Sequence, residues 1–193
     1  MRLEFFPFPF LLGIGMLLIL LMVLWRRKRD GSYLFCVSIF WIYLLILVGL
    51  TIFPIPIGAT AIGGARWRGT IPFILSRINF VPFHFGGLFS LPPTVIFREI
   101  LGNILLTVPF GFGVIFIAPL KVKNIPWLAF AVGLVIESTQ LLISIGLGAR
   151  YRGVDINDVI LNALGVLIGY GLFRIFAWIF LKLSHRFRIK PGG

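Results

Sequence analysis

Polar residues that can carry acid–base or binding chemistry gather in one stretch of an otherwise apolar chain, residues 133–171. Three of the six acidic residues of the chain lie in this stretch. An ionisable group at membrane depth costs about 2.5–3.5 kcal/mol on insertion scales, so such groups are usually paired and often functional. The stretch therefore predicts a polar site, whose candidate residues are Glu137, Gln140, Arg152, Asp155, Asp158 and Asn162.

These residue types support two kinds of chemistry. Glu137 or Asp158 can act as the general base of a proton transfer. The planar guanidinium of Arg152 can bind a phosphate or carboxylate group of a ligand. A metal site is not predicted, because the chain has no His-x-x-x-His motif and only one cysteine. No cofactor is predicted either, since the sequence has no glycine-rich phosphate loop or dinucleotide fingerprint.

The composition is that of a polytopic membrane protein. Of 193 residues, 59% are hydrophobic and only 12% are charged, whereas a soluble domain is about a quarter charged. A helix needs about 20 apolar residues to cross a bilayer, and five runs come near this length. We predict an all-α polytopic integral membrane helix bundle, with transmembrane helices at about 7–25, 33–53, 98–120, 125–145 and 156–181.

The basic residues determine the predicted orientation. The net charge of +12 is concentrated in clusters that follow the first, third and fifth apolar runs. Basic clusters face the cytoplasm, which predicts an outer N-terminus and a cytoplasmic C-terminus. The chain then divides into a first anchor with its basic loop (1–30), a membrane domain (31–181) and a basic tail (182–193). No soluble basic segment is present, so the predicted partner is the lipid bilayer and not nucleic acid.

The long connection over residues 54–97 lies on the outer side. It is rich in proline, glycine and aromatic residues, too apolar for a free linker and too interrupted for a spanning helix. We predict a re-entrant or interfacial segment that rests on the helix bundle. Its Arg66, Arg68 and Arg77 either meet phosphate groups at the outer surface or lie among lipid head groups.

Alternating spans bring the polar residues to one side of the membrane. Asn103 lies near the start of the third span, and Asp158 and Asn162 lie at the start of the fifth. Glu137 precedes the end of the fourth span by about eight residues, or about 12 Å. All of them therefore fall in the same half of the bilayer.

Helical spacing adds two expectations about packing. Gly165 and Gly169 form a G-x-x-x-G pair that allows a close helix approach. Pro109 and Gly111 are expected to weaken the third helix, because proline removes a backbone hydrogen bond.

A purely structural polar network is the alternative to a functional site. In it, Arg152 pairs with Asp155 or Asp158, and Asn162 bonds to Glu137, which fixes how the helices pack. A carboxylate is a costly way to join helices, since serine, threonine and asparagine can do the same. We therefore favour a functional site.

The ordered motifs of the chain resemble those of the VanZ-like membrane proteins. The resemblance covers about residues 40–175 and becomes nearly gapless in its last third. A second arginine, Arg150, competes with Arg152 for the motif position, and the spacing to Asp155 favours Arg152. The motifs are N-x-x-P-F from Asn79, Asn103 with P-x-G from Pro109, E-x-x-Q from Glu137, and R-x-x-D-x-x-D-x-x-x-N-x-x-G-x-x-x-G from Arg152 to Gly169.

The resemblance implies a bacterial cytoplasmic membrane protein. The family takes its name from a protein associated with low-level resistance to teicoplanin, a glycopeptide that binds cell-wall precursors and carries an acyl tail. The leading hypothesis is an outward-facing polar pocket that binds or alters a lipid-linked species or a glycopeptide. It would be lined by Asn79, Asn103, Glu137, Gln140, Arg152, Asp155, Asp158 and Asn162.

Two other classes of function stay open. One is a membrane enzyme for a lipid or polyprenyl-phosphate substrate, with Glu137 or Asp158 as base and Arg152 on the phosphate. The other is a structural membrane protein whose polar network only packs helices. A transporter is less favoured, because the sequence shows no internal repeat. The sequence determines neither the ligand nor the oligomeric state.

Overall fold

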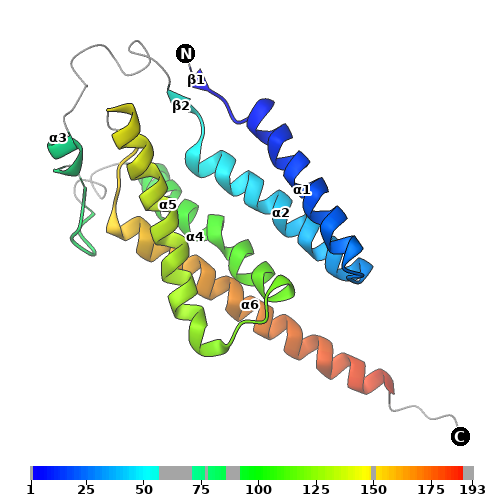
Figure 1. Ribbon diagram of the computed structural model, residues 1–193. Helices are drawn as coiled ribbons and strands as arrows, with labels where there is room; N and C mark the ends of the chain where they lie inside the picture. Colours follow the sequence, from blue (N-terminus) through cyan, green and yellow to red (C-terminus); the bar gives the residue numbers. More distant parts are fainter. Residues whose placement is uncertain (1, 57–70, 77, 86–91, 149–150, 189–193) are drawn as a thin grey trace, which may run out of the picture.

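The computed structural model shows a bundle of long helices (Figure 1). It describes residues 2–56, 71–76, 78–85, 92–148 and 151–188. Five of its helices are long and apolar enough to cross a membrane, which confirms the predicted all-α membrane bundle. They are α1 (Phe8–Arg26), α2 (Gly31–Ile52), α4 (Pro93–Ile117), α5 (Ile125–Leu147) and α6 (Ile156–Arg188).

Two helix boundaries differ from the prediction: α6 ends at Arg188 and not near residue 181, and α4 begins at Pro93 and not near residue 98. Proline is favoured in the first turn of a helix, because a backbone N–H at that position has no acceptor within the helix and proline has no N–H. The early start adds residues 93–97 to the helix, before the charged Arg98 and Glu99. These two charges interrupt the apolar run, so hydropathy alone does not reveal the first turns.

Helix α4 continues through Pro109 without a break, so the proline does not end the helix. The Tyr43 hydroxyl donates a hydrogen bond of 2.8 Å to the carbonyl oxygen of Leu106, in the turn before the proline. Gly111 has a packing role, because a Cβ at this position would collide with the backbone carbonyl of Val166. Tyr43 thus joins α2 to α4 near Pro109, and Gly111 allows α6 to approach α4.

The closest packing in the bundle joins α4 and α6, and the expected glycine contact is present. A Cβ at Gly165 would collide with the carbonyl oxygen of Ile104 and with the Thr107 hydroxyl. A Cβ at Gly169 would collide with the carbonyl oxygen of Val108. The two helices therefore touch through their backbones along one stripe.

The remaining helices surround this pair. Helix α5 packs against α6 (Figure 1). Helix α2 packs against α4 on one side and against α1 on another. The indole N–H of Trp41 donates to the carbonyl oxygen of Gly13 at 2.9 Å and fixes α1 against α2. A short 3-10 helix, η3 (Val122–Asn124), leads into α5.

The described parts of the outer connection lie at one end of the bundle (Figure 1). Strand β2 (Ile55–Pro56) pairs antiparallel with β1 (Arg2–Leu3). Helix α3 (Ile71–Leu75), in which Ile74 is buried, contacts α5. Strands β1 and β2 were not predicted, since two-residue strands show no alternation of polarity. Arg66, Arg68 and Arg77 lie outside the described residues.

The two ends of the bundle differ in charge. At the end that we call the carboxylate end, α2 and α5 finish and α4 and α6 begin. At the opposite end, the cationic end, lie Arg26–Arg29, Lys121 and Lys123. The predicted site residues belong to the carboxylate end.

Candidate functional site at the carboxylate end

Asn79 and Asp155 fasten the outer connection to the start of α6. The backbones of Asn79 and Asp155 form an isolated parallel β-bridge. The Asn79 N–H donates to the Val154 carbonyl at 3.1 Å, and the Asn79 carbonyl accepts from the Ile156 N–H at 3.0 Å. The Asn79 side-chain amide also donates to an Asp155 carboxylate oxygen at 2.8 Å. Both residues therefore have a structural task at this end of the bundle.

Asn157, which is not among the predicted site residues, completes this attachment. Its side chain is buried; Oδ1 accepts from the Phe83 N–H at 2.6 Å and Nδ2 donates to the His84 carbonyl at 2.9 Å. Its backbone N–H donates to Asp155 Oδ1 at 2.8 Å, so Asp155 caps α6. The sequence feature that could have indicated Asn157 is its place in a polar run directly before the apolar part of a helix.

Gln140, Tyr151 and Arg152 form a clamp on the end of α2, which we call the α2 clamp. Gln140 Nε2 donates to the Thr51 carbonyl at 3.1 Å, and the Tyr151 hydroxyl donates to the carbonyls of Ile52 and Pro54. The last carbonyls of a helix have no partner within the helix. The clamp residues, which lie in the second half of α5 and in the segment before α6, donate hydrogen bonds to these carbonyls.

Arg152 belongs to this clamp and not to the expected ion pair. Its guanidinium donates to the carbonyl oxygens of Leu50 at 3.3 Å and Phe53 at 3.1 Å. In the described part of the chain, it pairs with these carbonyls and not with Asp155 or Asp158. The competing Arg150 lies outside the described residues.

Loss of the Arg152 side chain is expected to loosen α2. Hydrogen bonds to charged groups contribute about 1.5–3 kcal/mol each, and partial exposure to water reduces the loss. We expect Arg152→Leu to lower the free energy of unfolding by about 1–3 kcal/mol, measured by thermal unfolding in detergent. Arg174→Leu is the control, because among the described residues Arg174 bonds to the Tyr170 hydroxyl, one turn away on the same helix α6. Equal losses in the two variants would contradict the clamp.

Glu137 lies in a small cavity between α5 and the start of α6. Its side chain is 4% exposed, and Oε2 accepts from the Asp155 backbone N–H at 3.1 Å. The cavity holds about 150 Å³, and Asn79, Ser138 and Asp155 also line it. Its remaining walls are apolar. A carboxylate on a rigid helix is thus held at the surface of a mainly apolar space.

Asp158 opens onto a larger space, which we call the acidic cavity. Asn103 Nδ2 donates to Asp158 Oδ1 at 2.7 Å and so orients the carboxylate. The cavity holds about 270 Å³ and is lined by Glu99, Asp155, Asn157 and Asp158, with Phe85, Val95, Ile100 and Leu161. Glu99 was not predicted, since it lies where the third span was expected to begin. Asp155 lines this cavity and the Glu137 cavity, so the two adjoin.

Asn162 stands one helical turn below Asp158 and is 1% exposed. Its backbone carbonyl accepts from the Thr107 hydroxyl at 2.7 Å. Neither polar atom of its side chain has a hydrogen-bond partner among the described residues, so the expected bond to Glu137 is not formed. A buried amide without a partner costs about 1–3 kcal/mol, which packing alone does not explain.

The predicted residues are therefore gathered at one end but do not share one pocket. Asn79, Glu137 and Asp155 line the smaller cavity, while Asp155 and Asp158 line the acidic cavity. Gln140 and Arg152 lie outside both and hold α2. Asn103 positions Asp158, and Asn162 lies beneath it.

Comparison with known families gives one match. The family model described as VanZ/LLP1 matches residues 40–177, a range that contains α4, α5 and both cavities. No curated protein and no solved structure is significantly similar to this chain.

Proposed function

The chain is a multi-pass membrane protein that belongs to the VanZ/LLP1 family, and we propose that its carboxylate end binds or alters a lipid-linked molecule of a bacterial cell envelope. The molecule is reached from the outer surface of the cytoplasmic membrane. Binding or altering it makes lipophilic glycopeptides such as teicoplanin less effective.

The distribution of basic residues supports this orientation. Arg26–Arg29, Lys121 and Lys123 lie together at the cationic end, and basic clusters favour the cytoplasmic side. The carboxylate end then faces outward, with the N-terminus outside and the C-terminus in the cytoplasm. Envelope precursors and glycopeptides are accessible on that outer side.

The acidic cavity is the observation that carries the proposal. Three carboxylates, Glu99, Asp155 and Asp158, line one space of about 270 Å³ at the end of an apolar bundle. An ionised carboxylate only accepts hydrogen bonds. A matching ligand therefore supplies donors, as the hydroxyl groups of a sugar or an ammonium group do.

The same geometry gives no support to direct phosphate recognition. Three carboxylates repel a phosphate in the acidic cavity. Arg152, the residue expected to bind phosphate, is already bonded to two backbone carbonyls. We therefore infer that a hydroxyl-rich or amine-bearing head group is recognised, and not a phosphate.

Antibiotic susceptibility tests the proposal. The chain is expressed in a sensitive Gram-positive host, and teicoplanin and vancomycin are compared at matched membrane levels. We expect wild type to protect against teicoplanin more than against vancomycin, and Asp158→Asn to return the host to the empty-vector level. Loss of one charged hydrogen bond corresponds to about 10- to 150-fold in affinity.

Two further variants make the result specific. Asp30→Asn removes an exposed carboxylate at the cationic end and should leave protection intact. Glu137→Gln keeps an acceptor for the Asp155 N–H but cannot take up a proton as a base, so its loss of protection would favour the enzymatic alternative. No protection from well-expressed wild type would refute the resistance role.

A further inference from the structure

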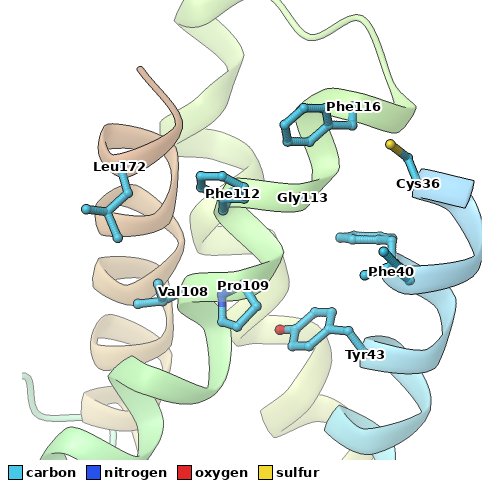
Figure 2. A pocket seen from close by; sticks show the side chains of 10 residues that line it. Cys36, Phe40, Tyr43, Val108, Pro109, Phe112, Gly113, Phe116 and Leu172 are labelled. Atoms are coloured by element: carbon cyan, nitrogen blue, oxygen red, sulfur yellow. The ribbon is translucent and has the colours of Figure 1, made fainter. Parts of the chain in front are cut away.

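An apolar groove lies between α2 and α4, away from the carboxylates. Its volume is about 450 Å³, within the range of ligand pockets. Figure 2 shows that Cys36, Phe40 and Tyr43 of α2 face α4 across it. The side of α4 is formed by Pro109, Phe112, Gly113 and Phe116.

The groove extends from near the cationic end to about the middle of α2. Cys36 and Tyr43 follow Gly31, the first residue of α2, by 5 and 12 positions. At 1.5 Å per residue they are about 8 and 18 Å along the helix. The hydrocarbon core of a bilayer is about 30 Å thick, so the groove begins in the leaflet at the cationic end and reaches about to the bilayer midplane.

The groove is open to the surroundings of the bundle and is narrow. Two of its lining residues, Ile39 and Phe116, are 54% and 39% exposed. Gly113 forms part of its wall, and a Cβ there would press on the Phe40 ring at 2.7 Å. If the groove were empty, the atoms that line it would lose dispersion contacts. A thin, flexible hydrocarbon chain fits this shape better than the broad surface of another helix.

Basic residues lie at the end of the groove. Tyr33 precedes Cys36 by one helical turn, and its hydroxyl donates to the Ile117 carbonyl at 3.3 Å. The Arg29 guanidinium lies 5.3 Å from the centre of the Tyr33 ring. Lys121 and Lys123 follow the end of α4 and are exposed. Each basic residue near a membrane surface strengthens binding of anionic lipid by about fivefold.

We propose that this groove binds one acyl chain of an anionic phospholipid from the leaflet at the cationic end. Arg29, Lys121 and Lys123 hold the head group, and the groove holds the chain beside Pro109. The site is independent of the carboxylate end. The lipid adds to the contacts between α2 and α4, which pack less extensively than α4 and α6 do.

Photo-crosslinking tests this site. The full-length protein is reconstituted in vesicles of equal parts phosphatidylglycerol and phosphatidylcholine, with a trace of phosphatidylglycerol that carries a diazirine in mid-chain. We expect crosslinks to concentrate on residues 36–43 and 108–116. Lys121→Gln with Lys123→Gln should lower them about 25-fold. A phosphatidylcholine probe should give few crosslinks there in any variant.

A groove-filling variant provides the second arm. Cys36→Trp should abolish the crosslinks, whereas Ile46→Trp, at an exposed position of α2 outside the groove, should preserve them. The lysine variants leave the apolar core intact, so they decide the question if Cys36→Trp does not fold. Crosslinks spread evenly over all exposed apolar residues would overturn the proposal. So would crosslinks between two copies of the chain at the groove.

Discussion

The Gly165→Ala protein is expected to lose about 2–4 kcal/mol of folding free energy. The added Cβ would collide with the carbonyl oxygen of Ile104 and with the Thr107 hydroxyl. A backbone atom cannot rotate away, so the two helices must separate. The Thr107 bond to the Asn162 carbonyl, 2.7 Å long, would be lost with them. Thermal unfolding in detergent, followed by near-UV circular dichroism, measures the effect.

Gly171→Ala is the matched control in the same helix. No atom lies within 4 Å of a Cβ at Gly171. Alanine favours a helix over glycine by about 0.5–1 kcal/mol, so this variant should be unchanged or slightly more stable. If both substitutions had the same effect, the close approach of α4 and α6 would not be what stabilises the bundle.

Asp155→Ala is expected to release residues 78–85 from the start of α6. The Asp155 carboxylate accepts from the Asn79 side chain and from the Asn157 N–H, both at 2.8 Å. Such charge-assisted bonds contribute about 1.5–3 kcal/mol each. Loss of about 3 kcal/mol locally makes amide exchange about 100-fold faster, since exchange follows local opening. Hydrogen exchange at the Val81 and Phe83 amides measures it directly.

Asp30→Ala is the control, because it shows whether removing any one carboxylate speeds amide exchange at residues 78–85. Asp30 precedes α2 at the opposite end and makes no side-chain capping bond. Exchange at residues 78–85 should be the same as in wild type. Unchanged exchange in Asp155→Ala would mean that other contacts hold the outer connection, and Asn157→Ala would then be the variant to measure.

The membrane spans could be predicted from sequence because their signal is composition, which does not depend on tertiary contacts. All five predicted helices are present. The errors lie where local chemistry overrides hydropathy. Helix α4 starts early at Pro93 because proline suits a first turn, although Arg98 and Glu99 break the apolar run. Strands β1 and β2 depend on a pairing between distant residues, which no local pattern reveals.

From the sequence, the topology of the helices predicts at which end of the bundle the site residues lie, but not which of them bond to each other. Alternating helices bring Asn103, Glu137 and Asp158 to one end whatever their partners are. Which atoms then bond depends on helix rotation and on the paths of the connections. That is why Arg152 reaches the end of α2 and not a carboxylate, and why Asn162 does not reach Glu137.

The α2 clamp also has a consequence for how the protein is made. Tyr151 and Arg152 bond to carbonyls of Ile52 and Phe53, which precede them by 99 residues in the chain. Ribosomes add about 5–20 residues per second, so α2 leaves the ribosome roughly 5–20 s before these partners exist. Throughout that interval water or the insertion machinery must satisfy the exposed carbonyls. The end of α2 therefore acquires its hydrogen-bond partners only after α5 and the segment before α6 have been made.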